Sequence, residues 1–255
     1  MTLQQIQDDL SRCYRAAREE VGDLGDLAGV PEPGGAARPA ARPMEAGDVR
    51  SEILTVVNEL YATQLITATG GNVSARCPNR DEAWITPSGL FKGDLRPEIL
   101  VRIGMDARPL DPGARSPSSE ALMHTAVLKA RPEANAVIHC HAPQATILVN
   151  AGLPFLPIST EAAFFNGIGR IPFIMPGTQE LADAIVAAMG TGWAVLMQNH
   201  GLLVAGRSLR RAADMAEIVE RTAEVIVGCH AVGREPPVLP EETVAMLARY
   251  GDLLA

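Results

Sequence analysis

The chain has 255 residues, a formal net charge of −8 and a hydrophobic content of 47%. This length and composition are typical of a globular protein that buries one sizeable core, and they do not require a second domain. Because the charge is acidic and the sequence contains no basic run, nucleic acid and anionic membrane surfaces are not expected partners.

The sequence also favours a cytoplasmic location. Residues 1–20 are polar and charged, so we expect no signal peptide. No apolar run approaches the length of about 18 residues that a membrane-spanning helix needs. The absence of a CxxC spacing favours reduced thiols over a disulfide framework. The four scattered cysteines are Cys13, Cys77, Cys140 and Cys229.

The N-terminal part differs in composition from the rest of the chain. Apolar residues at helical spacing predict an amphipathic helix over residues 3–21, and a stretch rich in Gly, Pro and Ala follows it up to Pro43. We therefore divide the chain into a helical arm with its linker, residues 1–43, and a folded domain, residues 44–255. The arm either packs on a neighbour or caps a site, or it is an extension without function.

Predicted helices and strands alternate through the folded domain, which indicates a layered α/β architecture. Helix starts are marked by capping residues, and strands by short apolar runs. The predicted elements in chain order are a helix over 49–65, a hairpin with strands within 67–76 and 83–86, a helix from 121, a strand over 135–141, a helix over 143–150, a helix from 178 to 189, a strand over 194–200, a helix over 208–230 and a further helix after 236.

The strand over 135–141 ends in two histidines that are two positions apart. Side chains on a strand alternate between its two faces, so His139 and His141 lie on one face and Cys140 on the other. A third imidazole, His200, follows the strand over 194–200. Three histidines and an open position are typical of a catalytic zinc site. Alternatively, the pair closes the strand and binds no metal.

Small polar residues gather where three loops enter or leave regular structure. Ser118 and Ser119 precede a helix, whose free N–H groups and dipole favour an anion. Together with Asn72, Ser88 and Gly89 they form a candidate cradle for a phosphate or carboxylate, although each is also an ordinary cap or turn residue.

The helix that begins after Ser119 carries two further candidates. Glu120 lies in its first turn, where it serves either as a cap or as a functional carboxylate. His124 lies four residues later on a similar face. It is either a packed histidine or a group that supports the site.

Five motifs together resemble the class II aldolase/adducin head family, and they occur in the family's order. They are Gly70–Ser74, Ile85–Gly89, Ser118–Glu120, His139–His141 and Asn199–Gly201. The resemblance implies a three-layer αβα sandwich with a mixed, largely antiparallel central sheet. It also implies a homotetramer with active sites at subunit interfaces, and it makes residues 44–255 the catalytic domain.

The resemblance also implies roles for particular residues. His139, His141 and His200 would bind Zn²⁺ or another divalent cation such as Mn²⁺, Co²⁺ or Fe²⁺. Glu120 would be the catalytic acid and base, able to bind the ion when no substrate is present. The residues implied to bind the substrate phosphate are Asn72, Ser88, Gly89, Ser118 and Ser119.

The implied chemistry is the cleavage or formation of a carbon–carbon bond beside a carbonyl. The ion would stabilise the enediolate left when the bond breaks, and Glu120 would move the proton on the adjacent carbon. The chain departs from the family after the histidine strand, where many members carry a tyrosine. That segment offers Glu161 instead, and Tyr250 near the C-terminus is a second candidate contact to substrate, in a neighbour's site.

Three functions remain open on the sequence. The favoured one is a metal-dependent aldolase acting on a sugar phosphate or a related hydroxy-carbonyl compound. The second is a decarboxylase of a hydroxylated or keto acid, in which the polar loops hold a carboxylate. The third is a non-catalytic adducin-like module, against which the intact Glu120 and the three histidines argue.

Overall fold

The computed structural model describes Arg12, residues 48–165 and residues 167–254, with side chains described as far as residue 248. The chain divides into two compact units, Met1–Glu45 and Ala46–Ala255. The predicted N-terminal helix and linker lie outside the described residues, apart from Arg12. The predicted start of the folded domain near residue 44 also lies outside them and stays a prediction.

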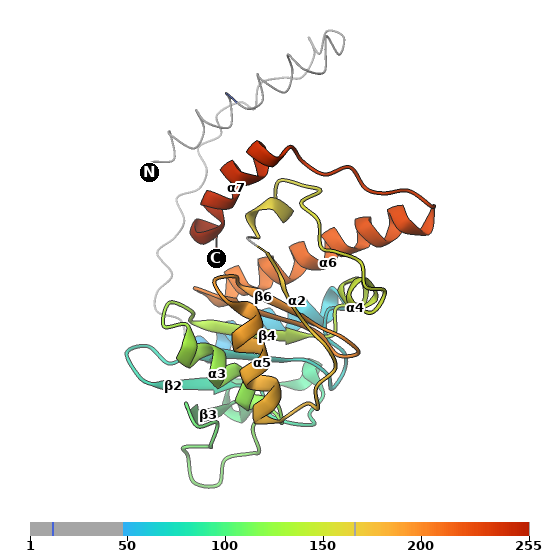
Figure 1. Cartoon of the computed structure of the whole chain (residues 1–255). Coiled ribbons are helices and arrows are strands. Elements are labelled where there is room, and N and C mark those ends of the chain that lie inside the picture. The colour runs from blue at the N-terminus through green and yellow to red at the C-terminus, as the bar shows by residue number, and fades with distance from the viewer. Residues whose placement is uncertain (1–11, 13–47, 166, 255) are drawn as a thin grey trace, which may run out of the picture. The chain divides into compact units, whose positions relative to one another are not determined.

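Within the described residues a seven-stranded sheet forms the centre of the domain (Figure 1). Its strand order is β3-β2-β1-β4-β7-β6-β5. Neighbouring strands are antiparallel except β5 and β6, which are parallel. The strands are β1 (Asn72–Arg76), β2 (Glu82–Ile85), β3 (Val101–Gly104), β4 (Ala136–Cys140), β5 (Gly169–Ile171), β6 (Ala194–Met197) and β7 (Gly201–Gly206).

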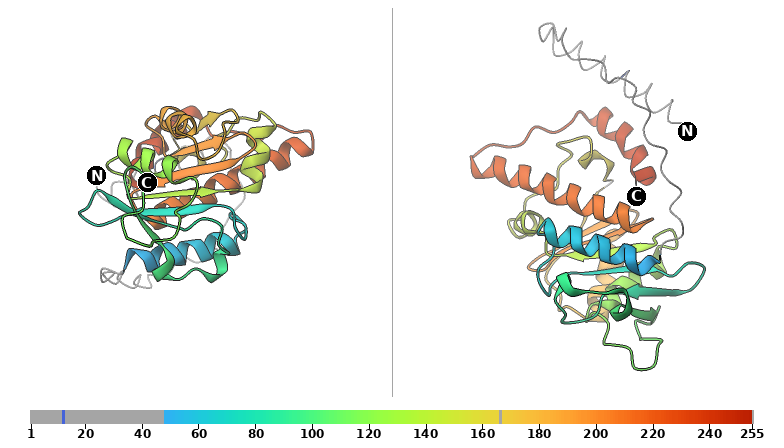
Figure 2. Two further views of the ribbon diagram at one scale, coloured as in Figure 1. Left: turned by 90° about the horizontal axis from the view of Figure 1, so that it is seen from below. Right: turned by 180° about the vertical axis from the view of Figure 1, so that it is seen from behind.

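Helices cover both faces of this sheet. Figure 2 shows α2 and α6 on one face, and Figure 1 shows α3 and α5 on the other. The α-helices are α2 (Val49–Ala62), α3 (Ala121–Ala130), α4 (Pro143–Asn150), α5 (Gln179–Met189), α6 (Leu209–Ala231) and α7 (Glu241–Leu254). The short 3₁₀ helices are η1 (Lys92–Asp94), η2 (Pro97–Ile99) and η3 (Ala162–Phe164). The predicted three-layer sandwich with a mixed, largely antiparallel sheet is therefore confirmed.

Burial follows from this layering. Every residue of β4, β6 and β7 is buried, because helices cover both faces of a central strand. These strands accordingly consist of near-continuous apolar runs. Two of the longer helices begin at capping side chains. Thr178 Oγ1 accepts from the N–H of Leu181 at the start of α5, and Ser208 Oγ accepts from the N–H of Arg211 at the start of α6.

The register of the central strands brings the polar motifs to one end of the sheet. Asn72, the first residue of β1, pairs with His139 near the end of β4. The hairpin of β1 and β2 then places the loop after Ile85 at that same end. Pro87 forms an isolated bridge with Pro117, which joins this loop to the segment that leads into α3.

The structure adds three strands that the sequence patterns do not predict, namely β3, β5 and β7. It also shortens the first predicted helix, which ends at Ala62. There the backbone reverses through Gln64, whose φ of 61° lies in the left-handed region. Among the described residues, no helix combines the length and the apolar character that a membrane span requires.

Candidate metal centre

The predicted pair of histidines lies at the end of β4 as expected from strand alternation. His139 Nε2 and His141 Nε2 are 3.1 Å apart. Cys140 is fully buried among apolar side chains of the core, and burial raises the pKa of its thiol to about 12. The thiol is therefore protonated at neutral pH, and thiolate, not thiol, binds metals.

His200 completes the cluster from the turn between β6 and β7. The preceding residue, Asn199, has a φ of 53°, a left-handed conformation that asparagine tolerates well. The ring centroid of His200 lies 4.6 Å from that of His139 and 5.9 Å from that of His141. One ligand atom from each of the three rings lies within 4.8 Å of the others.

The hydrogen bond that His139 makes with the backbone leaves the lone pair of its Nε2 directed at the other two imidazoles. His139 Nδ1 lies 3.0 Å from the carbonyl oxygen of Leu202, to which it donates. Nε2 is therefore the unprotonated nitrogen of the neutral ring. Burial lowers the pKa of His139 to about 3 and also lowers the pKa of His141, so both rings are neutral at pH 7, as metal ligands must be.

Glu120 faces the same cluster from the residue that immediately precedes α3. Its Oε1 lies 2.9 Å from His200 Nε2, and its Oε2 lies 3.4 Å from His139 Nε2. Asn72 Nδ2 donates a 2.9 Å hydrogen bond to Oε2. Burial by itself would raise the pKa of Glu120, but His200, His139 and Asn72 together outweigh burial and lower this pKa below its ordinary value.

This donor set fits a divalent cation. Glu120 Oε1 is buried and has no hydrogen-bond donor among the described residues, although His200 Nε2 lies 2.9 Å away. Nitrogens bound to one tetrahedral zinc are about 3.3 Å apart, given bonds of about 2.0–2.1 Å. The 3.1 Å between His139 Nε2 and His141 Nε2 is close to this spacing. A cation would satisfy lone pairs that otherwise face one another.

Glycine permits the close approach of the loop before β1. An added Cβ at Gly70 would lie 2.8 Å from His141 Nδ1 and 2.6 Å from Thr67 Oγ1. The next residue, Gly71, has a φ of 79°, and its Cβ would lie 2.4 Å from Ile66 Cγ2. The Gly-Gly motif therefore shapes the wall beside His141.

The predicted anion-binding loops lie beside Glu120. The N–H of Ser88 donates to the carbonyl of Ser116, and the N–H of Ser118 donates to the carbonyl of Thr86. Ser118 Oγ in turn accepts from the N–H of Glu120 at 3.3 Å. Ser88, Gly89 and Ser119 are exposed, whereas Ser118 is buried. These contacts place all three loops at one end of the sheet.

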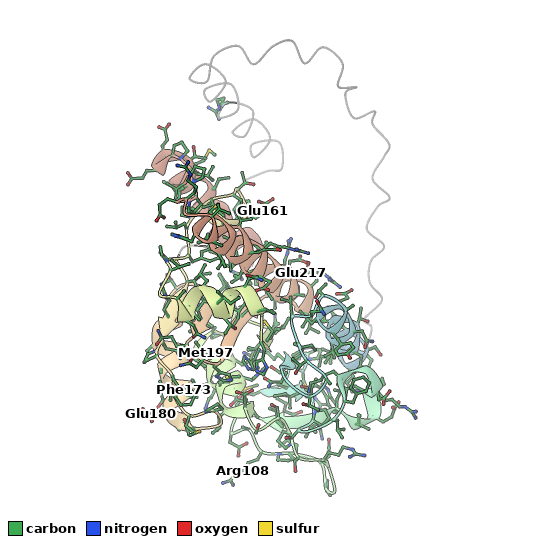
Figure 3. The ribbon with its side chains drawn as sticks, turned by 90° about the vertical axis from the view of Figure 1, so that its right-hand side faces the viewer. Arg108, Glu161, Phe173, Glu180, Met197 and Glu217 are labelled. Carbon is green, nitrogen blue, oxygen red and sulfur yellow. The ribbon has the colours of Figure 1, made fainter. Side chains whose placement is uncertain are left out.

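One predicted contact to substrate, Glu161, lies apart from the cluster within this chain. Figure 3 labels Glu161 and Met197, the last residue of β6, and the two lie well apart. Glu161 is exposed just before η3, and a hydrogen bond from its own backbone lowers the pKa of its carboxyl. The side chain of Tyr250 lies outside the described residues. The roles of Glu161 and Tyr250 stay predictions.

Two buried residues reach the site through Asn72. His124 Nε2 lies 2.5 Å from Asn72 Oδ1, and His124 Nδ1 lies 2.7 Å from Ser74 Oγ. The helical spacing of Glu120 and His124 points to the histidine as a candidate. Ser74 belongs to the Gly70–Ser74 motif, but nothing in its spacing indicates a contact with His124.

Comparison with known proteins agrees with this geometry. Residues 51–227 match the family described as Class II Aldolase and Adducin N-terminal domain. The 5-deoxy-D-ribulose 1-phosphate aldolase of Bacillus thuringiensis serovar kurstaki is 32% identical over 201 residues, covering 78% of this chain and 93% of that protein. The 3-oxo-tetronate 4-phosphate decarboxylase of Escherichia coli is 28% identical over 186 residues, covering 70% and 85%.

Among solved structures, an L-fuculose 1-phosphate aldolase superposes with a TM-score of 0.73 and 30% identity. The match covers 80% of this chain and 96% of that one. These relatives are named for reactions at carbon–carbon bonds, and the family match over residues 51–227 spans all seven strands and the histidine motifs. The chain therefore belongs to the family of class II aldolase and adducin N-terminal domains.

Proposed function

We propose that this protein is a divalent-metal-dependent aldolase that cleaves, or in reverse forms, a ketose 1-phosphate. The observation that carries the proposal is the convergence of His139, His141 and His200 with the buried carboxylate of Glu120. The polar loops beside that carboxylate supply a place for the phosphate. Both aldolases named above act on sugar phosphates, which supports the same substrate class here.

The three imidazoles would hold the ion, for which we propose Zn²⁺. Neutral imidazole nitrogens suit zinc, and three protein ligands with an open position are its catalytic arrangement. When bound, the ion supplies a Lewis acid that polarises the carbonyl and hydroxyl oxygens of the substrate. Leu202 fixes the orientation of His139 by accepting from Nδ1.

Glu120 would carry out the proton transfer. In aldol cleavage, the carbon beside the carbonyl must regain a proton when the bond to the neighbouring carbon breaks. Glu120 is a carboxylate at neutral pH by the direction of its pKa, and it faces the imidazoles from a separate element. It can therefore remove a proton in the condensation direction and return one in cleavage.

The loops would bind the phosphate without a lysine or arginine. The exposed hydroxyls of Ser88 and Ser119 near the start of α3 suit an anion, because the helix dipole favours negative charge there. The residues proposed for this role are Asn72, Ser88, Gly89, Ser118 and Ser119.

We extend the proposal to assembly and location. A homotetramer would let Glu161 and Tyr250 of one chain contribute to the site of a neighbour, which accords with the exposure of Glu161. Cys77, Cys140 and Cys229 are free thiols, which accords with the reducing cytoplasm.

Product analysis tests the aldolase assignment. Purified protein loaded with Zn²⁺ is incubated with a series of ketose 1-phosphates, and released aldehyde and dihydroxyacetone phosphate are measured. We expect both products in equal amounts. Carbon dioxide release without aldehyde would overturn the assignment in favour of the decarboxylase.

The decarboxylase stays a second candidate because of one observation. A relative that shares 28% identity and 85% of its length with this chain is a decarboxylase of a 3-oxo acid phosphate. The same arrangement of histidines and Glu120 suits either reaction, so incubation with 3-oxo acid phosphates and measurement of carbon dioxide separates the two. A non-catalytic module would require that the protein as purified lack stoichiometric metal and release neither product.

A further inference from the structure

A chain of buried polar side chains leads from the middle of β1 to Glu120. Ser74 Oγ lies 2.7 Å from His124 Nδ1, and His124 Nε2 lies 2.5 Å from Asn72 Oδ1. Asn72 Nδ2 then donates to Glu120 Oε2 at 2.9 Å. Ser74 and His124 are fully buried, and Asn72 is 5% exposed.

The Glu120 carboxylate, at one end of this series of hydrogen bonds, fixes the direction of each of them. An ionised carboxylate only accepts, so the Asn72 nitrogen faces Glu120 and the Asn72 oxygen faces His124. His124 must then donate from Nε2, which leaves Nδ1 to accept the hydroxyl proton of Ser74. Burial lowers the pKa of His124 to about 4, so the ring is neutral at pH 7, as this arrangement requires.

The fold explains why these residues meet. Asn72 and Ser74 are two positions apart on β1 and therefore share one face of the strand. Glu120 and His124 are four positions apart at the start of α3 and share one side of the helix. This series of hydrogen bonds thus joins β1 to the start of α3.

We propose that His124, supported by Ser74, is a positioning residue that orients the Asn72 amide so that its nitrogen holds Glu120 in one orientation toward the three imidazoles. Without this contact the Asn72 amide keeps only one of the two hydrogen bonds that hold its plane, so it holds Glu120 less firmly. This inference rests on the proposed function, because it assigns to Glu120 the proton transfer.

A pair of substitutions separates the two hydrogen bonds of His124. A glutamine amide nitrogen extends about as far from Cα as Nε2, and an asparagine amide about as far as Nδ1. His124→Gln therefore keeps the donor to Asn72, whereas His124→Asn keeps only a partner for Ser74. Both variants replace the ring by a neutral amide, so each is the control for the other.

Kinetics of the Zn²⁺-loaded variants with a cleaved ketose 1-phosphate give the first readout. A hydrogen bond to a charged group accounts for about tenfold to a hundredfold in rate. We expect His124→Asn to lower kcat by about that factor with KM nearly unchanged, and His124→Gln to stay within about threefold of wild type. Equal kcat for the two variants, or a loss in KM alone, would overturn the proposal.

Ring-nitrogen NMR of the wild-type protein gives a readout that does not depend on activity. With ¹⁵N-labelled histidine at pH 7, we expect the His124 signals to show a protonated Nε2 and an unprotonated Nδ1, assigned by their loss in His124→Gln. The opposite tautomer, or a doubly protonated ring, would overturn the proposed direction. If the wild type cleaves no ketose 1-phosphate, the proposed function fails, while these signals still decide the hydrogen-bond chain.

Discussion

The imidazole rings of His139 and His200 lie 4.6 Å apart, although they come from two segments separated by three helices and two strands. β4 and β7 are neighbours, and β7 turns back from β6 through the segment that carries His200. The antiparallel pairing of β6 with β7 therefore brings the third histidine to the end of β4. A mechanism that needs all three imidazoles depends on this single turn.

Removal of one imidazole should abolish metal binding and activity together. In His139→Ala or His200→Ala, only two of the three nitrogens remain, which does not suffice for a catalytic zinc site. We expect less than stoichiometric zinc by elemental analysis and loss of aldehyde release. His230→Ala is the matched control, because His230 lies at the end of α6 and pairs with Glu235. Full zinc content in His139→Ala would contradict the assignment.

Glu120→Gln should separate metal binding from turnover. The amide keeps the shape of the carboxylate but does not accept the proton. Proton transfer by a placed base contributes on the order of 10²–10⁴ in rate, and we expect kcat to fall by about this factor. Zinc content should stay stoichiometric, because the three imidazoles are intact. An unchanged kcat would show that another group carries the proton.

The close contact at Gly70 predicts a steric effect on the candidate metal centre. In Gly70→Ala the new methyl group would lie 2.8 Å from His141 Nδ1, closer than van der Waals contact allows, so the ring must move. We expect weaker zinc binding, measured by competition with a chelator, with the fold retained by circular dichroism. Gly228→Ala on α6 is the control, because nothing lies within 4 Å of its added Cβ. Equal zinc affinity in the two variants would exclude displacement of His141.

The start of α4, two residues after His141, is held by a carboxylate from α6. Glu220 accepts from the N–H groups of Gln144 at 3.0 Å and Ala145 at 2.9 Å, and the helix dipole favours this charge. Glu220→Ala should lower the free energy of unfolding by about 1–2 kcal/mol in urea titrations. Glu224→Ala, which removes only an exposed pair with Arg221, should cost less than about 0.5 kcal/mol. Similar losses in both variants would exclude the capping role.

His124 should make the stability of the metal-free protein sensitive to acid. Its pKa falls from an ordinary value of 6.5 to about 4 in the folded state, so between these values the unfolded chain binds a proton that the folded chain does not. The part of the free energy of unfolding that depends on a neutral His124 is fully present above about pH 6.5. It is lost as the pH falls to about 4, and the loss amounts to about 3 kcal/mol.

The matched measurement compares wild type with His124→Gln by urea unfolding in the presence of a chelator. As the pH is lowered from 7 to 4, the free energy of unfolding should fall more for the wild type than for His124→Gln. Parallel pH curves for both would contradict a neutral His124 in the folded protein.

The sequence predicted the histidine pair and the fold class correctly, because both follow from local spacing and from the order of the motifs. Strand alternation alone predicts that His139 and His141 face one side and Cys140 the other, and the 3.1 Å between the two Nε2 atoms agrees with it. The fold class followed from alternating elements and from five motifs in order. β7 was not predictable in the same way, because an apolar run between Gly201 and Gly206 suits a strand or a buried helix segment equally.

Contacts across the fold were beyond the reach of the sequence. Asn72 was a candidate for an anion loop, but its hydrogen bonds to Glu120 and His124 depend on the register of β1 with β4 and on how α3 packs. The exposed position of Glu161, apart from Met197, likewise depends on the path of the chain between α4 and β5. Neither local propensity nor spacing encodes such distances.

The burial of Cys140 has a consequence for the kind of donor that the candidate metal centre offers. Because the pleat of β4 turns this sulfur into the core, an incoming ion meets nitrogen and oxygen donors only from the residues gathered at the strand end. Soft ions such as monovalent copper gain little from such donors. One alternation along a single strand thus keeps a soft sulfur ligand out of the candidate metal centre.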